Sequence, residues 1–214
     1  MLLNLERVDF LIGQYVSGVL PEPAQVLVGS HLEMQTSSGL LARTLQDLAG
    51  EALNRTEPVG LSHPNQRLQA ILQSPSPNTD PAQPTLEESE FPAVLRAYTR
   101  KDLGAIPWKR KLPGIRQYII ESSADMEASL IWARPGRALP HHSHQGLELT
   151  LVLEGEFHDH RGRFKEGEIS VADESFDHRP VAGRLGPCLC FSVLFAPIAL
   201  SGSTLRLFGD LIGI

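Results

Sequence analysis

The chain has 214 residues, of which 42% are hydrophobic and 21% are charged, and its formal net charge is −6 at pH 7. This length allows one large domain or two small ones, and the acidic balance gives no general attraction for the phosphates of nucleic acids. The two cysteines, Cys188 and Cys190, lie too close together for an ordinary disulfide, which argues against a disulfide-stapled secreted protein.

Helical periodicity dominates the first part of the chain, up to residue 74. Apolar residues recur at helical spacing between Leu5 and Val19, and a second helix is expected over 24–35. A third helix, capped by Ser37 or Ser38, would carry an apolar stripe from Leu41 to Ala52, and a short fourth is expected over 65–73. This pattern predicts a small helical bundle.

A proline-rich segment, residues 75–88, separates this part from the rest and predicts an extended linker. From residue 89 to 214 the pattern changes to short apolar, β-branched runs separated by turns, over 117–121, 128–133, 147–154, 168–172 and 188–195. We therefore predict an α+β protein with a helical domain at 1–74 and an all-β domain at 89–214.

The N-terminal segment carries acidic residues within its apolar pattern, which argues against a signal peptide. No apolar run reaches membrane-spanning length. We expect a cytoplasmic protein that does not bind membranes.

A candidate metal site lies in the strand-rich part. His142, His144 and Glu148 keep the same parity along an extended segment, so their side chains should point to one face, and His178 follows in a later segment. Three imidazoles and a carboxylate form a ligand set for a divalent metal ion. Glu148 could bind the metal directly, or it could hydrogen-bond to one of the ligands without touching the metal.

The other histidines and the cysteines have simpler interpretations. His141 has the wrong parity for the site, and His158 and His160 fit an exposed hairpin turn better than a second metal site. Buried cysteines usually act as small hydrophobic residues, which we expect for Cys188 and Cys190, with redox sensing as the alternative.

These spacings resemble the first motif of the cupin family, with Gly136, His142, His144, Glu148 and Gly155 at its fixed positions. Its second motif is matched by Gly167 and His178, whereas Asp173, Ser175 and Ala182 replace the usual proline, glycine and asparagine. The resemblance implies a jelly-roll barrel with one divalent metal inside. Zinc is expected first, with iron, manganese or nickel as alternatives, and cupins can pair into homodimers.

The helical part with its linker and cupin is similar to the ChrR-type anti-sigma factors of the zinc-binding group, whose helical signature is H-x3-C-x2-C. His31 stands at the histidine position, but Gln35 and Ser38 replace the two cysteines, and a further ligand would fall near Glu6. Because an amide and a hydroxyl are poor zinc ligands, we expect no tight N-terminal zinc and a structural role for His31, with weak metal binding by His31 and Glu6 as the alternative.

This resemblance implies a regulator rather than an enzyme. The helical domain would sequester an extracytoplasmic-function sigma factor, and the metal-bearing cupin would sense an oxidative or small-molecule signal. The alternative is a metal-dependent cupin dioxygenase of the diketone-cleaving type, because an open metal site serves either use.

Overall fold

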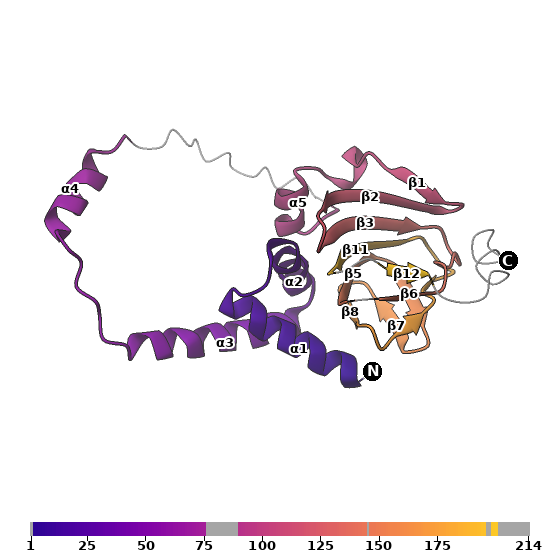
Figure 1. The fold of residues 1–214 in the computed structure, drawn as a ribbon, viewed down its shortest axis with the longest axis horizontal. Helices are drawn as coiled ribbons and strands as arrows, with labels where there is room; N and C mark the ends of the chain where they lie inside the picture. Colours follow the sequence, from indigo (N-terminus) through magenta and orange to yellow (C-terminus); the bar gives the residue numbers. More distant parts are fainter. Residues whose placement is uncertain (1, 76–89, 145, 196–197, 201–214) are drawn as a thin grey trace.

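The computed structural model describes residues 2–75, 90–144, 146–195 and 198–200, apart from the side chains of Leu2, Leu3, Leu5, Glu6 and His144 and of residues 198–200. Helices occupy the N-terminal part and strands the C-terminal part, which confirms the α+β prediction (Figure 1). The helices are α1 Leu2–Ser17, α2 Glu22–Met34, α3 Thr36–Asn54, α4 Pro64–Gln73 and α5 Ala93–Thr99, followed by a 3-10 turn at Leu103–Ala105. Most of the predicted linker lies outside the described residues.

The predicted cap of α3 is wrong. The helix begins at Thr36, so Ser37 and Ser38 lie inside its first turn, and the residue before it, Gln35, makes no capping hydrogen bond. The Gln35 side chain instead donates to the carbonyl of Glu166 in the strand-rich part, at 3.1 Å. A tertiary contact therefore replaces the local cap.

Of the predicted small helical bundle, α1, α2 and the first half of α3 pack together. Figure 1 shows α1 and α2 against the strands, whereas α3 runs outward and α4 stands apart from the other helices. Leu41 and Leu45 are partly buried in the core that α1 and α2 share, but further along the same stripe Leu48 is exposed. We call residues 46–73, from the outer half of α3 to the end of α4, the arm.

The strands form one large sheet and two small ones. The six-stranded sheet has the order β1-β2-β3-β11-β5-β8, and the two three-stranded sheets have the orders β10-β6-β7 and β12-β4-β9. The bounds are β1 Lys109–Leu112, β2 Ile115–Ser122, β3 Glu127–Ala133, β4 His142–His144, β5 Glu148–Glu154, β6 Glu156–Asp159, β7 Gly162–Lys165, β8 Ile169–Ala172, β9 Asp177–His178, β10 Val181–Ala182, β11 Cys188–Leu194 and β12 Ile198–Leu200. All pairings are antiparallel, and the five predicted strands are all present.

Strand β11 shows how the large sheet is buried on both faces. Leu189, Phe191 and Val193 belong to a core shared with α1, α2 and α5, whereas Cys188 and Cys190 belong to a second core with residues of β6, β7 and β10. Because side chains alternate along a strand, the helices cover the outer face of the sheet and the small sheets lie over its inner face. The inner face is where the candidate ligands meet.

Candidate metal centre

Three of the four predicted ligands converge on the inner side of the barrel. His142 on β4, Glu148 at the start of β5 and His178 on β9 each offer an atom within 4.8 Å of the others. The register places them there, because β4 pairs with β9 so that His142 is directly opposite His178. The backbone of His144 lies in β4, but its side chain is outside the described residues, so its role stays a prediction.

The two imidazoles turn their Nε2 atoms toward each other. Nδ1 of His142 lies 2.8 Å from the carbonyl of Pro140, and Nδ1 of His178 lies 2.9 Å from Oδ2 of Asp159. Both partners can accept, so in the tautomer that a metal requires each Nδ1 carries the proton and each ring offers Nε2 as the ligand atom, while Nη2 of Arg161 also lies 3.1 Å from Nδ1 of His178. The two Nε2 atoms are 3.1 Å apart. Two Nε2 atoms at this distance can bind the same cation, so the donor set fits a metal ion.

Glu148 completes the cluster with one oxygen. Its Oε1 accepts hydrogen bonds from the hydroxyls of Thr150 at 3.0 Å and Ser192 at 3.4 Å, and its Oε2 lies 3.5 Å from Nε2 of His178. The hydroxyls fix the rotation of the carboxylate, which turns its second oxygen toward the histidines. The His142, Glu148 and His178 side chains can therefore bind a divalent metal ion.

Asp159 is a functional residue that sequence analysis overlooked. The prediction of a hairpin at 158–160 is correct, and His158 and His160 are exposed, but the side chain of Asp159 is fully buried behind His178. Arg161 holds this carboxylate with Nη2 at 2.6 Å and Nε at 3.0 Å. The available signal was alternation, because the residue between two outward histidines on a strand must point inward.

This arrangement shifts the pKa values of both partners. Burial opposes charge on Asp159, but its hydrogen bonds with His178 and Arg161 outweigh that and hold its pKa well below the usual range. Burial lowers the pKa of His178, and hydrogen bonds to Asp159 and Glu148 more than reverse this effect and raise it. Asp159 is therefore a permanent carboxylate that orients His178 for metal binding.

A small cavity of about 40 Å³ adjoins the cluster. Glu148, Thr150 and His178 line one side of it, and Cys188 and Cys190 line the other. This volume exceeds the roughly 10–15 Å³ that a single water requires. The cavity is therefore large enough for water or another molecule of a few atoms beside the ligands.

The two cysteines are reduced, buried and adjacent, with their sulfur atoms 3.5 Å apart. Hydrogen bonding to Cys188 and burial raise the pKa of the Cys190 thiol. A raised pKa keeps this sulfur protonated at neutral pH, which agrees with the predicted structural role more than with a reactive thiolate.

Two of the N-terminal positions that resemble a zinc motif, His31 and Gln35, are hydrogen-bonded to the barrel. His31 is buried, and its Nδ1–H donates to the carbonyl of Gly167 at 2.6 Å. The Gln35 amide donates to the Glu166 carbonyl. A cleft lies between the helices and the barrel, and Ser38 lines it together with His31 and Gln35. The side chain of Glu6 lies outside the described residues. That no tight zinc binds here remains a prediction.

Fold and cluster together define a cupin that carries an N-terminal helical domain. Residues 97–196 match the family described as ChrR Cupin-like domain. The chain is 34% identical over 197 residues to the anti-sigma-E factor ChrR of Cereibacter sphaeroides, covering 89% of each protein. It also matches the crystal structure of Rhodobacter sphaeroides SigE in complex with the anti-sigma ChrR, with a TM-score of 0.74 and 33% identity over 87% of this chain and 96% of that one. The chain therefore belongs to the ChrR family of anti-sigma factors.

Proposed function

We propose that this chain is an anti-sigma factor whose arm binds an extracytoplasmic-function sigma factor in the cytoplasm. The observation that carries the proposal is the exposed apolar surface of the arm, in a protein whose relative is solved in complex with SigE. The metal-bearing cupin would act as the sensor domain. The division into a helical domain at 1–74, a linker at 75–88 and a cupin at 89–214 is part of this proposal.

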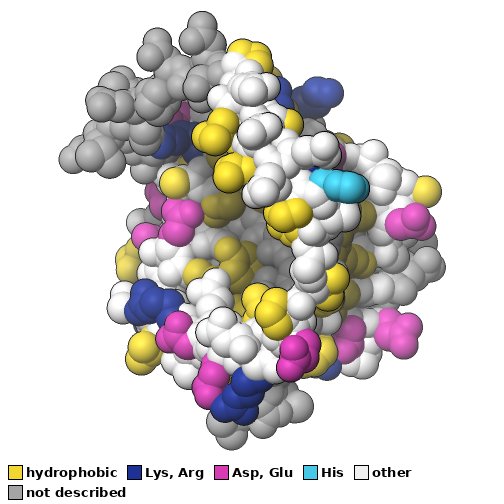
Figure 2. Space-filling view, turned by 90° about the vertical axis from the view of Figure 1, so that its left-hand side faces the viewer, with side chains coloured by type: hydrophobic (Ala, Val, Ile, Leu, Met, Phe, Trp, Pro, Cys, Tyr) yellow, Lys and Arg dark blue, Asp and Glu magenta, His cyan; other side chains and the backbone are white. Residues whose placement is uncertain are grey.

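The arm has the character of a binding surface. On α4, Leu68, Ile71 and Leu72 share one face at helical spacing and are all more than half exposed. Further exposed apolar side chains follow the chain through the arm: Leu48, Leu53, Val59 and Leu61. Figure 2 views the molecule from this side, with hydrophobic side chains around a hollow between arm and body. Seven exposed large apolar side chains within this one segment favour a protein partner.

In the cupin, His142, Glu148 and His178 would hold the metal, with Glu148 as a direct ligand and His144 as the fourth. Zinc is the first expectation because histidine nitrogen and carboxylate oxygen donors suit it, with iron, manganese or nickel as alternatives. A bound ion would supply a positive centre joining β4, β5 and β9. The adjoining cavity of about 40 Å³ suits a signal molecule of a few atoms, such as a small oxidant.

The same cavity disfavours the dioxygenase alternative. Small-molecule sites usually measure about 300–1,000 Å³. The cavity beside the cluster, as far as the described residues define it, has about 40 Å³, which is far below that range and disfavours a diketone substrate. The relationship to an anti-sigma factor likewise favours a regulator over an enzyme.

Among the described residues, no helix has the length and apolarity to cross a bilayer.

The test is a direct binding experiment with the purified full chain and the sigma factor encoded beside its gene. We expect a stable one-to-one complex by calorimetry and about one equivalent of metal per chain by elemental analysis. Absence of binding to this sigma factor and to the others of the same genome, combined with oxygen uptake in the presence of a diketone, would contradict the proposal and support the enzyme.

A further inference from the structure

One barrel segment, residues 166–178, joins the helical domain to the metal cluster. It begins at the β7–β8 turn, includes all of β8 and ends at His178. At its start, His31 donates to the Gly167 carbonyl at 2.6 Å and Gln35 to the Glu166 carbonyl at 3.1 Å. Gly167 has a φ of +80°, and a Cβ atom there would lie 2.3 Å from the Gln35 amide. The α2–α3 corner is thus fitted closely onto this turn.

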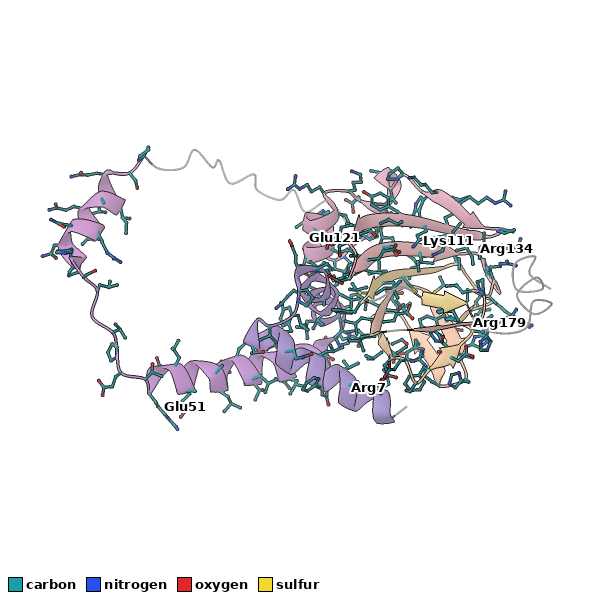
Figure 3. The ribbon with its side chains drawn as sticks, in the orientation of Figure 1. Arg7, Glu51, Lys111, Glu121, Arg134 and Arg179 are labelled. Atoms are coloured by element: carbon teal, nitrogen blue, oxygen red, sulfur yellow. The ribbon has the colours of Figure 1, made fainter. Side chains whose placement is uncertain are left out.

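Helix α1 contacts the same segment further along. The Asn4 side chain donates to the carbonyl of Ile169 at 2.8 Å and accepts from the amide of Val171 at 3.0 Å. This pair of bonds copies the pairing of a neighbouring strand, at the edge of the six-stranded sheet where β8 lies. One turn later, Arg7 forms an ion pair with Asp173 at 2.7 Å and lies 5.3 Å from the centre of the Phe176 ring. Figure 3 labels Arg7 where α1 meets the barrel.

From inside the barrel, Arg161 contacts the same residues. Its Nη1 donates to the Val171 carbonyl at 2.8 Å, and its guanidinium lies 5.1 Å from the centre of the Phe176 ring. Val171 is therefore bonded to Asn4 through its amide and to Arg161 through its carbonyl, and Phe176 contacts both Arg7 and Arg161. Arg161 also holds Asp159, which orients His178. These contacts form an unbroken path from the metal cluster to α1.

We propose that this path couples the metal cluster to the helical domain, with Asn4, Arg7, His31 and Gln35 as an interdomain clasp on residues 166–176. Two clasp residues, His31 and Gln35, occupy positions that resemble a zinc motif, so in this chain hydrogen bonds to the barrel stabilise the α2–α3 corner in place of a metal. The proposal rests on the proposed function in one respect, that the cluster binds a metal ion. A metal ion bound by the cluster would restrict the motion of His178. Because Asp159 and Arg161 connect His178 to Val171 and Phe176, these residues would be restricted as well.

The test is amide hydrogen exchange on the full chain, with and without added zinc. In the wild-type protein we expect zinc to slow exchange in residues 166–178 and also in α1 and the α2–α3 corner. In the double variant Asn4→Ala/Arg7→Ala, which removes both contacts of α1 with this path, zinc should still slow exchange in 166–178 but should leave α1 unchanged. Arg163→Ala is the control, because Arg163 lines the same cleft but its ion pair, at 3.6 Å, is with Glu156 of the barrel. This control should behave as wild type.

Three results would overturn the coupling. Zinc could leave exchange in 166–178 unchanged, it could slow that segment without affecting the wild-type helices, or it could still slow exchange in α1 of the double variant. Sigma-factor binding is measured separately. In wild type we expect zinc to change the affinity by about 5- to 150-fold, the usual range for linked sites, and in the double variant by less than about 2-fold, well below that range. If no sigma factor binds at all, the proposed function fails, while the exchange data still decide the coupling.

Discussion

Oδ2 of Asp159 lies 2.9 Å from Nδ1 of His178, and both side chains are buried. The carboxylate fixes the tautomer of the imidazole, so the lone pair of Nε2 faces His142 and Glu148. Loss of a residue that hydrogen-bonds to a metal ligand typically weakens metal affinity by about 10- to 100-fold. Asp159 should therefore influence metal affinity through His178, although it is not itself a ligand.

Asp159→Asn should therefore weaken metal binding by about 10- to 100-fold without abolishing it. The amide would leave His178 free to adopt the other tautomer, and it would lose the charge that Arg161 faces. Competition with a chromophoric chelator measures the affinity. The control is Asp125→Asn in the exposed β2–β3 turn, whose affinity should equal that of wild type. Equal affinities for all three proteins would contradict this role of Asp159.

The arm offers a second prediction. Because Ile71 and Leu72 are 69% and 74% exposed, aspartate at either position should leave the free energy of unfolding nearly unchanged. If the arm is the sigma-binding surface, each substitution should cost about 2 kcal/mol of binding energy or more, roughly a 30-fold loss of affinity. Calorimetry measures the affinity, and thermal melts check folding.

Leu185→Asp is the matched control for the arm, since Leu185 is equally apolar and fully exposed, but lies in the β10–β11 turn of the barrel. It should bind the sigma factor as tightly as wild type. If Leu185→Asp weakens binding as much as the arm variants do, the surface has been misassigned.

The strands could be predicted because burial on both faces leaves a clear signal in composition. Strand β11 is apolar at nearly every position, and the prediction for 188–195 matches Cys188–Leu194. The arrangement of the helices could not be predicted, because periodicity reports an apolar face without reporting what covers it. The stripe from Leu41 to Ala52 is one face in sequence, yet its first half packs in the core and its second half is exposed.

For the site, the motif spacing identified His142, Glu148 and His178, since strand parity and pairing bring them together. Alternation could have placed Asp159 inside the barrel, but the contacts of Asn4 and Arg161 with β8 were beyond reach, because they depend on how distant segments pack. The turn before His178 is an intermediate case. It lacks the proline and glycine of the family motif, and the Asp173 side chain instead accepts from the Ser175 amide at 3.0 Å.

His31 should make the attachment of the helices to the barrel pH-dependent. Burial lowers the pKa of His31 from 6.5, and the Gly167 carbonyl and Glu168 only partly offset this. Protonation therefore favours the detached state, where the pKa is normal. The stabilisation by neutral His31 is complete above about pH 6.5 and is lost as the pH falls from there toward the lowered pKa. The charged groups that line the cleft around His31 are Arg7, Asp9, Arg161, Arg163 and Glu168.

We expect thermal stability and protection of α2 from hydrogen exchange to fall between pH 7 and pH 5.5 in the wild-type protein. The variant His31→Asn keeps a donor near the place of Nδ1 but cannot titrate, so its pH dependence in this range should be weaker. An equally steep decline in both proteins would assign the effect to other groups.

Substitution of Gly155 would show why the first cupin motif ends in glycine. Its φ is +75°, and a Cβ atom at this position would lie 2.2 Å from the carbonyl oxygen of Pro187, the residue that precedes β11. Two costs therefore add for Gly155→Ala. One is the strain of a left-handed backbone, and the other is a collision with main chain that cannot rotate away.

Together these costs should reduce the free energy of unfolding by about 3 kcal/mol or more. Gly186→Ala is the control next to Pro187, since Gly186 has no left-handed φ and a Cβ atom there would meet nothing within 4 Å. That variant should differ from wild type by less than about 1 kcal/mol, as measured by chemical denaturation. If Gly155→Ala unfolds like Gly186→Ala, the β5–β6 turn can move away from Pro187, and the glycine serves something other than this close approach.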